Sequence, residues 1–211
     1  MHPTALAYLK WYHETNIWKQ LHYRGVRTLK LPSDMWNYQE ILIEHDVEWV
    51  IETGSRHGGS AIFFADVLRN AGREGKVFSI DFQPDLDPRV LADPLVEFIT
   101  GDSANPAIVD QVMQRLPADR KNVFLILDSD HSARHVKREL DAWIPRLRAG
   151  DYLVVEDTVV NGNPVRPDHG PGPLEAIREY VGENPKALIR DTAREAKFGA
   201  TFAPEGYYRI A

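Results

Sequence analysis

The sequence contains no cysteine. A disulfide framework, a thiolate nucleophile and a cysteine-ligated zinc or iron–sulfur site are therefore excluded. The composition is not extreme either: 43% of the residues are hydrophobic and 27% are charged, as in ordinary folded domains. This composition predicts a soluble globular protein, and the lack of cysteine permits a reducing compartment.

Basic residues are fewer than acidic ones, and long apolar runs are missing. With 25 Lys and Arg against 31 Asp and Glu, the formal net charge is −6, so a general affinity for nucleic-acid phosphates is not expected. No apolar stretch is long enough to span a bilayer, and residues 1–16 lack a basic leader followed by an apolar run. These features predict a cytoplasmic protein with neither a nucleic-acid partner nor a membrane span.

The 211 residues suffice for one substantial core, and no change in composition marks a second independent domain. Apolar residues at helical spacing predict two helices, over residues 5–21 and 35–45. We therefore expect an N-terminal helical extension over residues 1–46 and a main domain over residues 47–211. Aromatic residues of the extension could cover a site, form the contacts of a homo-oligomer or pack onto the core: Trp11, Tyr12, Trp18, Trp36 and Tyr38.

From residue 47 onward, short β-rich runs alternate with helical segments. Helical spacing predicts helices over residues 59–69, 136–147 and 174–181. Such an alternation is typical of an α/β, doubly wound fold with a mostly parallel sheet covered on both faces. The last two strands, joined through residues 203–205, should form an antiparallel hairpin. Apolar runs predict the strands at residues 47–51, 76–80, 97–100, 123–127, 152–155, 187–189, 199–202 and 206–210.

A glycine-rich turn over residues 52–60 follows the first of these strands. Ligands of open parallel sheets bind outside the carboxyl ends of the strands, and glycine lets the backbone approach a ligand where a helix begins. The spacing Gly54-x-x-x-Gly58-Gly59 departs from the dinucleotide fingerprint, which favours a ligand without a diphosphate. A structural turn without a ligand is the alternative. The residues predicted to hold a nucleotide-like cofactor here are Glu52, Gly54, Ser55 and Ser60.

The ends of the second and third strands strengthen the prediction of a cofactor site. Asp81 follows the second strand, where a carboxylate can accept hydrogen bonds from ribose hydroxyls. The segment Gly101-Asp102-Ser103 follows the third strand and is placed to contact an adenine ring. Together with the turn, these positions favour ligand binding over a purely structural turn.

Three acidic residues follow the fourth and fifth strands: Asp128, Glu156 and Asp157. Since these strands should be neighbours, their carboxylates are expected to converge as hard oxygen ligands for Mg²⁺ or a similar divalent cation. Such a cation can lower the pKa of an acceptor hydroxyl and align it for attack. Carboxylates that cap helices and face solvent are the alternative. Two competing functions are a metal-dependent hydrolase built on this cluster and a non-catalytic assembly protein that retains the fold.

His131 lies three residues after Asp128 and is the candidate general base. An unperturbed imidazole titrates near neutral pH, as proton transfer at that pH requires. A structural role is the alternative for His131. We expect His57, His135 and His169 near the same crevice and assign no role to them.

These motifs together resemble the cephalosporin hydroxylase-like and rhamnosyl O-methyltransferase family. The resemblance covers most of the chain. It implies a class I methyltransferase fold with a seven-stranded Rossmann-like sheet, S-adenosylmethionine as cofactor and a magnesium site similar to that of catechol-type O-methyltransferases. The matching segments are residues 30–40 (KLPSDMWNYQE), 52–54 (ETG), 58–60 (GGS), 128–131 (DSDH), 155–158 (VEDT), 170–173 (GPGP) and 204–207 (PEGY).

The resemblance implies methylation of a hydroxyl group on a sugar, a glycolipid or a small natural product. It also implies oligomers formed through the N-terminal helices. We expect Asp128 and His131 to be catalytic, and Asp102 and Asp128 to complete the cofactor site. Family members often carry Asn where this chain has Asp130, which places an extra negative charge beside the site, where it could strengthen metal binding or merely face solvent. The matching positions are Asp128, Glu156 and Asp157 for the metal and Glu52, Gly54, Ser60, Asp81 and Ser103 for the cofactor.

Overall fold

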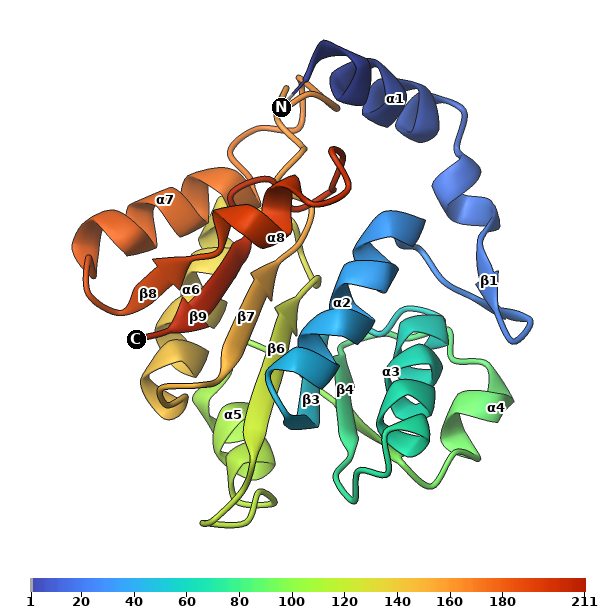
Figure 1. Ribbon diagram of the computed structural model, residues 1–211, viewed down its shortest axis with the longest axis vertical. Helices are drawn as coiled ribbons and strands as arrows, with labels where there is room; N and C mark the ends of the chain where they lie inside the picture. Colours follow the sequence, from blue (N-terminus) through green and yellow to red (C-terminus); the bar gives the residue numbers. More distant parts are fainter. Residues whose placement is uncertain (1) are drawn as a thin grey trace.

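A seven-stranded sheet forms the centre of the molecule in the computed structural model, which describes residues 2–211 (Figure 1). The strands are β3 (Val47–Thr53), β4 (Val77–Asp81), β5 (Val96–Thr100), β6 (Asn122–Leu127), β7 (Tyr152–Val155), β8 (Leu188–Arg190) and β9 (Tyr207–Ile210). Their order in the sheet is β5-β4-β3-β6-β7-β9-β8. Only β9 runs against its neighbours β7 and β8; the other pairings are parallel. The predicted doubly wound, mostly parallel α/β sheet is confirmed.

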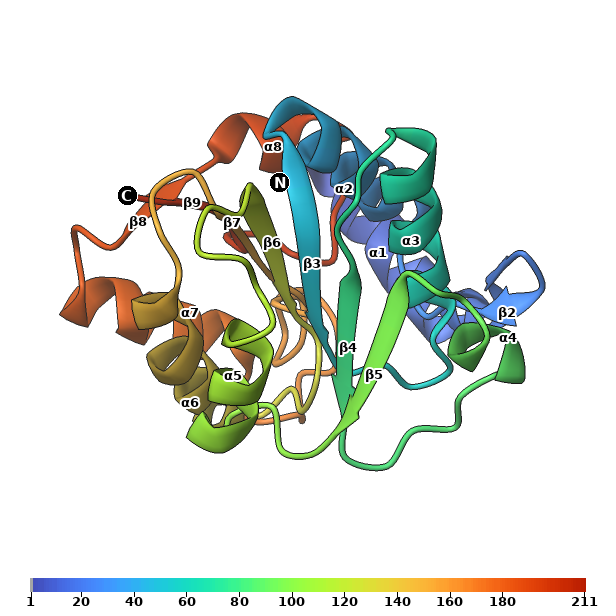
Figure 2. The same cartoon turned by 90° about the horizontal axis from the view of Figure 1, so that it is seen from below.

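Helices cover both faces of this sheet (Figure 2). One face carries α5 (Pro106–Met113), α6 (Ala133–Trp143) and α7 (Pro173–Glu183), and the other carries α2 (Pro32–Glu44), α3 (Gly59–Asn70) and α4 (Pro88–Leu91). In β6, Leu125 packs with Trp143 on the first face, whereas Phe124 packs with Phe64 on the second. Successive side chains of a strand point to opposite faces. The continuous apolar run of β6 is therefore explained by burial on both sides.

The N-terminal segment is more broken than the helix predicted over residues 5–21. Helix α1 (Pro3–Glu14) ends early, and a 3₁₀ turn, η1 (Ile17–Gln20), follows it. Between them the Thr15 hydroxyl donates to the carbonyl of Trp11 at 2.6 Å, and Asn16 adopts a left-handed conformation with φ 56°. Asn tolerates that conformation, which a continuing helix cannot contain. Two short paired strands, β1 (His22–Tyr23) and β2 (Val26–Arg27), were not predicted.

The predicted C-terminal antiparallel strands are present, but one member of the pair was assigned wrongly. Residues 199–202 form no strand, and β9 pairs instead with β8, from Leu188 opposite Ile210. The backbone of the 199–202 region bonds to side chains: the Phe202 N–H donates to Asp34 at 2.8 Å and the Ala203 N–H to Thr201 at 3.0 Å. A short helix, α8 (Thr192–Ala196), follows β8. Side-chain partners thus replace the strand ladder that apolar alternation had indicated.

Asp34 of α2 ties the N-terminal segment to the C-terminal one. Its carboxylate is 1% exposed and accepts hydrogen bonds from the Phe202 N–H and, at 3.0 Å, from the Tyr207 hydroxyl. Tyr38 and Ile41 of the same helix belong to the core on that face of the sheet. Helix α2 therefore shares the core of the main domain, and the boundary at residue 46 stays a prediction.

The buried carboxyl of Asp34 should make stability depend on pH. Burial raises its pKa to about 6, against the opposing hydrogen bonds from Thr201 and Phe202, whereas an Asp in an unfolded chain titrates near about 3.9. The folded state therefore binds this proton more tightly, so the contribution to stability grows as the pH falls through 6 and is lost above it. Between pH 7 and 4.5, the free energy of unfolding of the wild type should rise by about 2 kcal/mol relative to Asp34→Asn. Urea denaturation measures both proteins, and a pH-independent difference between them would contradict the assignment.

Candidate active site

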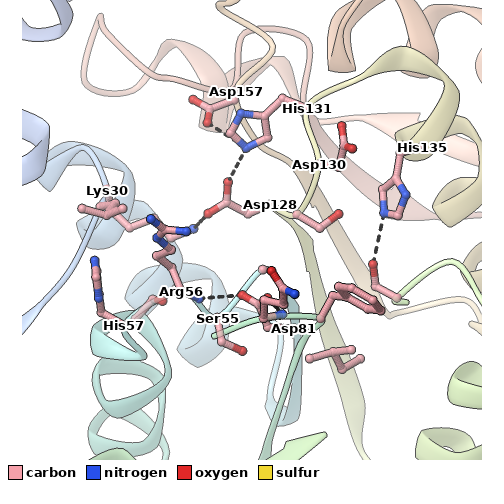
Figure 3. A pocket seen from close by; sticks show the side chains of 18 of the residues that line it. Lys30, Ser55, Arg56, His57, Asp81, Asp128, Asp130, His131, His135 and Asp157 are labelled. Atoms are coloured by element: carbon pink, nitrogen blue, oxygen red, sulfur yellow. Dashed lines mark hydrogen bonds and ion pairs between the residues drawn. The ribbon is translucent and has the colours of Figure 1, made fainter. Parts of the chain in front are cut away.

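A crevice of about 790 Å³ opens at the carboxyl ends of the parallel strands (Figure 3). This volume lies within the range of small-molecule sites, about 300–1,000 Å³. Two of the predicted residues, Glu52 and Glu156, are buried behind its wall. The other predicted site residues line it: Gly54, Ser55, Ser60, Asp81, Asp102, Ser103, Asp128, His131 and Asp157.

The glycine turn brings three strand ends into contact. Gly54 follows β3 with φ +85°, and a Cβ built there would lie 1.9 Å from the carbonyl oxygen of Asp128 after β6. Its N–H donates to the carbonyl of Ile80 in β4 at 2.8 Å. Gly58 has φ +80° and immediately precedes α3. Gly54 is therefore required both by its backbone conformation and by the close approach of β6.

Asp81 lies at the end of β4 and faces the glycine turn. Its carboxylate accepts hydrogen bonds from the backbone N–H groups of Arg56, at 2.8 Å, and Gln83, at 2.9 Å. These bonds fix the side chain on the floor of the crevice. Phe82, the next residue, lines the crevice and is 70% exposed. Our sequence reasoning missed Phe82, although an apolar residue directly after a strand-terminal acid was a usable signal.

Glu52 lies under the turn. It is fully buried and accepts a hydrogen bond from the Ser79 hydroxyl at 2.8 Å, while Ser79 and Ser55 share a second bond at 2.6 Å. Among the described residues, its Oε1 atom has no hydrogen-bond partner. A buried carboxylate oxygen is costly without a partner. Glu52 therefore supports the turn from below, and among the described residues its Oε1 atom remains available to accept a hydrogen bond.

The segment after β5 forms the opposite wall. Asp102 accepts from the Ala104 N–H at 2.9 Å and pairs with Arg138 at 2.9 Å. The Ser103 hydroxyl donates to the fully buried Glu139 at 2.6 Å. His135 also lines the crevice, 3.2 Å from the Ser103 oxygen. This wall is thus braced by α6, which supplies Glu139, Arg138 and His135.

The acids after β6 and β7 meet at the far end of the crevice with His131 between them. The His131 Nε2 atom lies 3.2 Å from Asp128 and 3.1 Å from Asp157. One ligand atom from each of these three residues lies within 4.8 Å of the others. The carboxylate oxygens of Asp128 and Asp157 are hard ligands that fit a divalent cation such as Mg²⁺, and His131 lies between them. Asp130 also lines the crevice, but it is exposed, accepts from the Ser132 N–H at 2.7 Å and is not a member of this trio.

Glu156 points away from this trio, toward Lys30. The Lys30 ammonium pairs with Glu156 at 3.1 Å and also contacts Asp128, and the Tyr38 hydroxyl donates to Glu156. Lys30 is 2% exposed. Our sequence reasoning noted Lys30 only as part of a motif, because a lysine 98 positions before Asp128 gives no local sign of this contact. The three acids are neighbours as predicted, and their role as metal ligands stays a prediction.

The charges of this cluster shift its protonation equilibria. Burial raises the pKa of Glu156 to about 8, although Lys30 opposes the shift. Burial would also raise the pKa of Asp128, but Lys30 and His131 hold it below its ordinary value. Burial alone would lower the pKa of His131, but Asp157 and Asp128 raise it to about 9. His131 is therefore protonated at neutral pH while it faces both carboxylates.

The wall beside Asp157 comes from the N-terminal segment and from two late loops. His13 and Trp18 line the crevice, with their rings stacked at a centroid distance of 6.0 Å. Arg166 and Phe202 line it from the late loops. Of the N-terminal aromatic residues, Trp18 thus reaches the crevice, Tyr12 and Tyr38 are buried in the core, and Trp11 and Trp36 are 50% and 59% exposed.

A seven-stranded sheet in this order, with a glycine turn after β3 and acids after its neighbours β6 and β7, is the architecture of class I S-adenosylmethionine-dependent methyltransferases. The chain belongs to the rhamnosyl O-methyltransferase/CmcI family, whose model matches residues 15–211. It is an S-adenosylmethionine-dependent O-methyltransferase. The family resemblance found in the sequence motifs is confirmed.

Named relatives and a solved structure agree with this membership. The chain is 47% identical to a rhamnosyl O-methyltransferase of Mycobacterium tuberculosis (strain H37Rv) and 48% identical to one of Mycobacterium leprae. Both matches run over 204 residues and cover 96% of this chain, with 83% and 89% of the relatives. A structure of CmcI with Mg and SAM shares the fold, with a TM-score of 0.67, 21% identity and coverage of 92% of this chain and 77% of that one. The competing metal-dependent hydrolase finds no support in these matches.

Proposed function

We propose that this chain methylates a hydroxyl group of a rhamnosyl-type sugar, with Mg²⁺ bound beside the acceptor. The observation that supports the proposal is that the residues proposed to hold the cofactor (the cofactor half) and those proposed to hold the cation (the cation half) lie at one crevice and meet at Asp128. The carbonyl of Asp128 touches Gly54, and its carboxylate faces His131. An acceptor bound between the halves would thus lie next to both.

The residues divide into two groups by task. S-adenosylmethionine supplies an activated methyl group, held at the turn, at Asp81 and at the Asp102 to Ser103 wall. Bound Mg²⁺ would lower the pKa of the acceptor hydroxyl as a Lewis acid. Asp157 and Asp128, with Glu156 behind them, would hold the Mg²⁺ ion. The reaction forms a bond from the acceptor oxygen to the methyl carbon and breaks the carbon–sulfur bond of the cofactor, so positioning by these side chains is the main catalytic contribution.

His131 is the proposed general base for the acceptor proton. Protonated as it is between two carboxylates, its Nε2–H donates to Asp128 and its charge pairs with Asp157, so it cannot take up a proton in this state. A cation bound to those carboxylates would remove the cause of its raised pKa and leave the imidazole neutral. The base role therefore belongs to the cation-loaded enzyme.

The acceptor is proposed to bind beside Asp157. Trp18 and Phe202 offer apolar surface for the face of a sugar ring, and His13 and Arg166 offer hydrogen-bond donors. The curated relatives are named for a rhamnosyl acceptor. Incubation with S-adenosylmethionine, MgCl₂ and an α-rhamnoside should yield a methylated sugar by mass spectrometry, with an α-galactoside as control. Cofactor binding without transfer to any rhamnoside would reject the acceptor class.

Two further expectations remain proposals. We propose a homo-oligomer assembled through the N-terminal segment, supported by the exposed Trp11 and Trp36. We also propose a cytoplasmic location. In residues 2–211, no helix has the length and apolar character of a membrane span. Light scattering of the purified chain measures the assembly, and a monomer at micromolar concentration would reject it.

Replacing Asp81 by Ala should weaken cofactor binding and leave the cation site intact. A lost hydrogen bond to a charged group corresponds to about 10- to 100-fold in affinity, so the Kd of S-adenosylmethionine should rise by that factor in calorimetry. Asp85→Ala is the matched control, because its side chain is 85% exposed and pairs only with His57 at 3.4 Å. Equal weakening in both variants would count against a specific contact at Asp81.

A further inference from the structure

We propose that Lys30 is a positioning residue of the cation site: its ammonium group holds Asp128 and Glu156 in place and limits how tightly a divalent cation binds. This inference rests on the metal site of the proposed function. It concerns a side chain that lies outside the predicted ligand set. The consequence is a site built to bind its cation with moderate affinity.

The first step is the placement of Lys30. It precedes α2, yet its side chain reaches the carboxyl ends of β6 and β7, where it meets Asp128 (Figure 3) and also Glu156. The Tyr12 hydroxyl donates to the Lys30 carbonyl at 3.1 Å, and Leu31 beside it is 1% exposed. The backbone of Lys30 is thus anchored, and its side chain, which is 3% exposed, has little freedom to leave.

The second step is the side of Asp128 that Lys30 occupies. Lys30 contacts the Oδ2 atom of Asp128, whereas His131 faces the Oδ1 atom. The trio able to bind a cation, Asp128, His131 and Asp157, lies on the His131 side. A cation bound there changes the partners of Oδ1 and leaves the Lys30 contact in place. Lys30 is therefore a positive charge that stays next to the site, whereas His131 is the positive charge whose contact with Asp128 the cation would replace.

The third step is electrostatic. Buried carboxylates repel one another, and a fixed positive charge offsets part of that repulsion before any cation arrives. The same charge repels the arriving cation, because it lies one carboxylate away. Removing it should therefore destabilise the cation-free protein and tighten cation binding at the same time. A lysine with only a packing role would lower stability without changing cation affinity.

The test compares Lys30→Met with wild type, using Mn²⁺ as the probe. Electron paramagnetic resonance gives the Kd of Mn²⁺, and thermal unfolding in EDTA and in MgCl₂ gives the stability of both forms. We expect Kd to fall about tenfold or more, Tm in EDTA to fall by roughly 6–12 °C, and MgCl₂ to recover more Tm in the variant than in wild type. Lys10→Met, the same change at an exposed position, should match wild type in all three.

The outcomes separate this inference from the proposed function. Unchanged or weaker Mn²⁺ binding by Lys30→Met overturns the inference, and absence of Mn²⁺ binding by wild type overturns the proposed metal site itself. Recovery of the variant only in the presence of MgCl₂ would support the inference. If Lys30→Met does not fold at all, Lys30→Gln keeps hydrogen-bond donors without the charge. An unchanged Mn²⁺ Kd in Lys30→Gln would then overturn the inference.

Discussion

Asp128→Asn is expected to lower kcat by about 100- to 1,000-fold and to change the Kd of S-adenosylmethionine by less than about threefold. The carboxylate of Asp128 belongs to the cation trio, whereas the cofactor turn meets the backbone of Asp128, through the carbonyl beside Gly54 and the N–H that donates to Thr53. Asn keeps that carbonyl and the side-chain shape but removes the charge that a divalent cation requires. Methyl-transfer kinetics and calorimetry measure the two effects separately.

The matched control for this variant is Asp130→Asn. Asp130 lies two residues away and also lines the crevice, but it is exposed, lies outside the cation trio and bonds locally to the Ser132 N–H, so its change should leave kcat near wild type. Equal losses of cofactor affinity and of kcat in Asp128→Asn would contradict the division between a cofactor half and a cation half.

Gly54→Ala should destabilise the fold by at least about 4 kcal/mol and abolish cofactor binding. The added methyl would lie 1.9 Å from the Asp128 carbonyl oxygen, and the residue would have to keep φ +85°. Neither strand end can move without breaking the pairing of β3 with β6, which runs from Val47 to Thr53. Urea denaturation measures the loss of stability.

Gly72→Ala separates the two causes of this effect. Gly72 also has positive φ, +66°, but a Cβ there would meet nothing within 4 Å. Gly72→Ala should therefore lower the free energy of unfolding only by the cost of a positive φ for alanine, about 1–2 kcal/mol. If Gly54→Ala costs no more than Gly72→Ala, the close contact between the strand ends is not what requires glycine at position 54.

The sequence predicted those parts of the site that follow directly from strand ends. Gly54, Asp81 and Asp128 each come just after or at the end of an apolar run, and the carboxyl ends of parallel strands meet at one edge. The crevice was therefore predictable without the fold in three dimensions. The exposure of Asp130 was not predictable, because a loop lacks the regular alternation of side chains that a strand has.

Contacts between distant segments could not be predicted in the same way. Lys30 meets Asp128 from 98 residues away, and no periodicity encodes such a pairing. The strand predicted over residues 199–202 was wrong for the same reason, because Asp34 of α2 takes the Phe202 N–H that a strand partner would have received. The local alternation of residues indicated a strand there, but a hydrogen bond to a distant side chain replaces the strand pairing.

The wall beside Asp157 was only partly foreseeable. Trp18 was among the aromatic residues proposed to cover a site, but nothing in its spacing distinguished it from Trp11, which is 50% exposed. The helix break at Asn16 is what carries Trp18 to the crevice. The proposed contact of Trp18 with the acceptor would therefore depend on a local helix break that helical spacing did not reveal.

Binding of S-adenosylmethionine to the purified wild-type chain tests the central claim most directly. Calorimetry should give one site per chain, and at about 100 times Kd the cofactor should stabilise the protein by about 2.7 kcal/mol, which raises Tm by roughly 5–10 °C. No heat of binding and no shift in Tm at saturating cofactor would contradict the assignment of the crevice at Gly54 and Asp81 as the cofactor site.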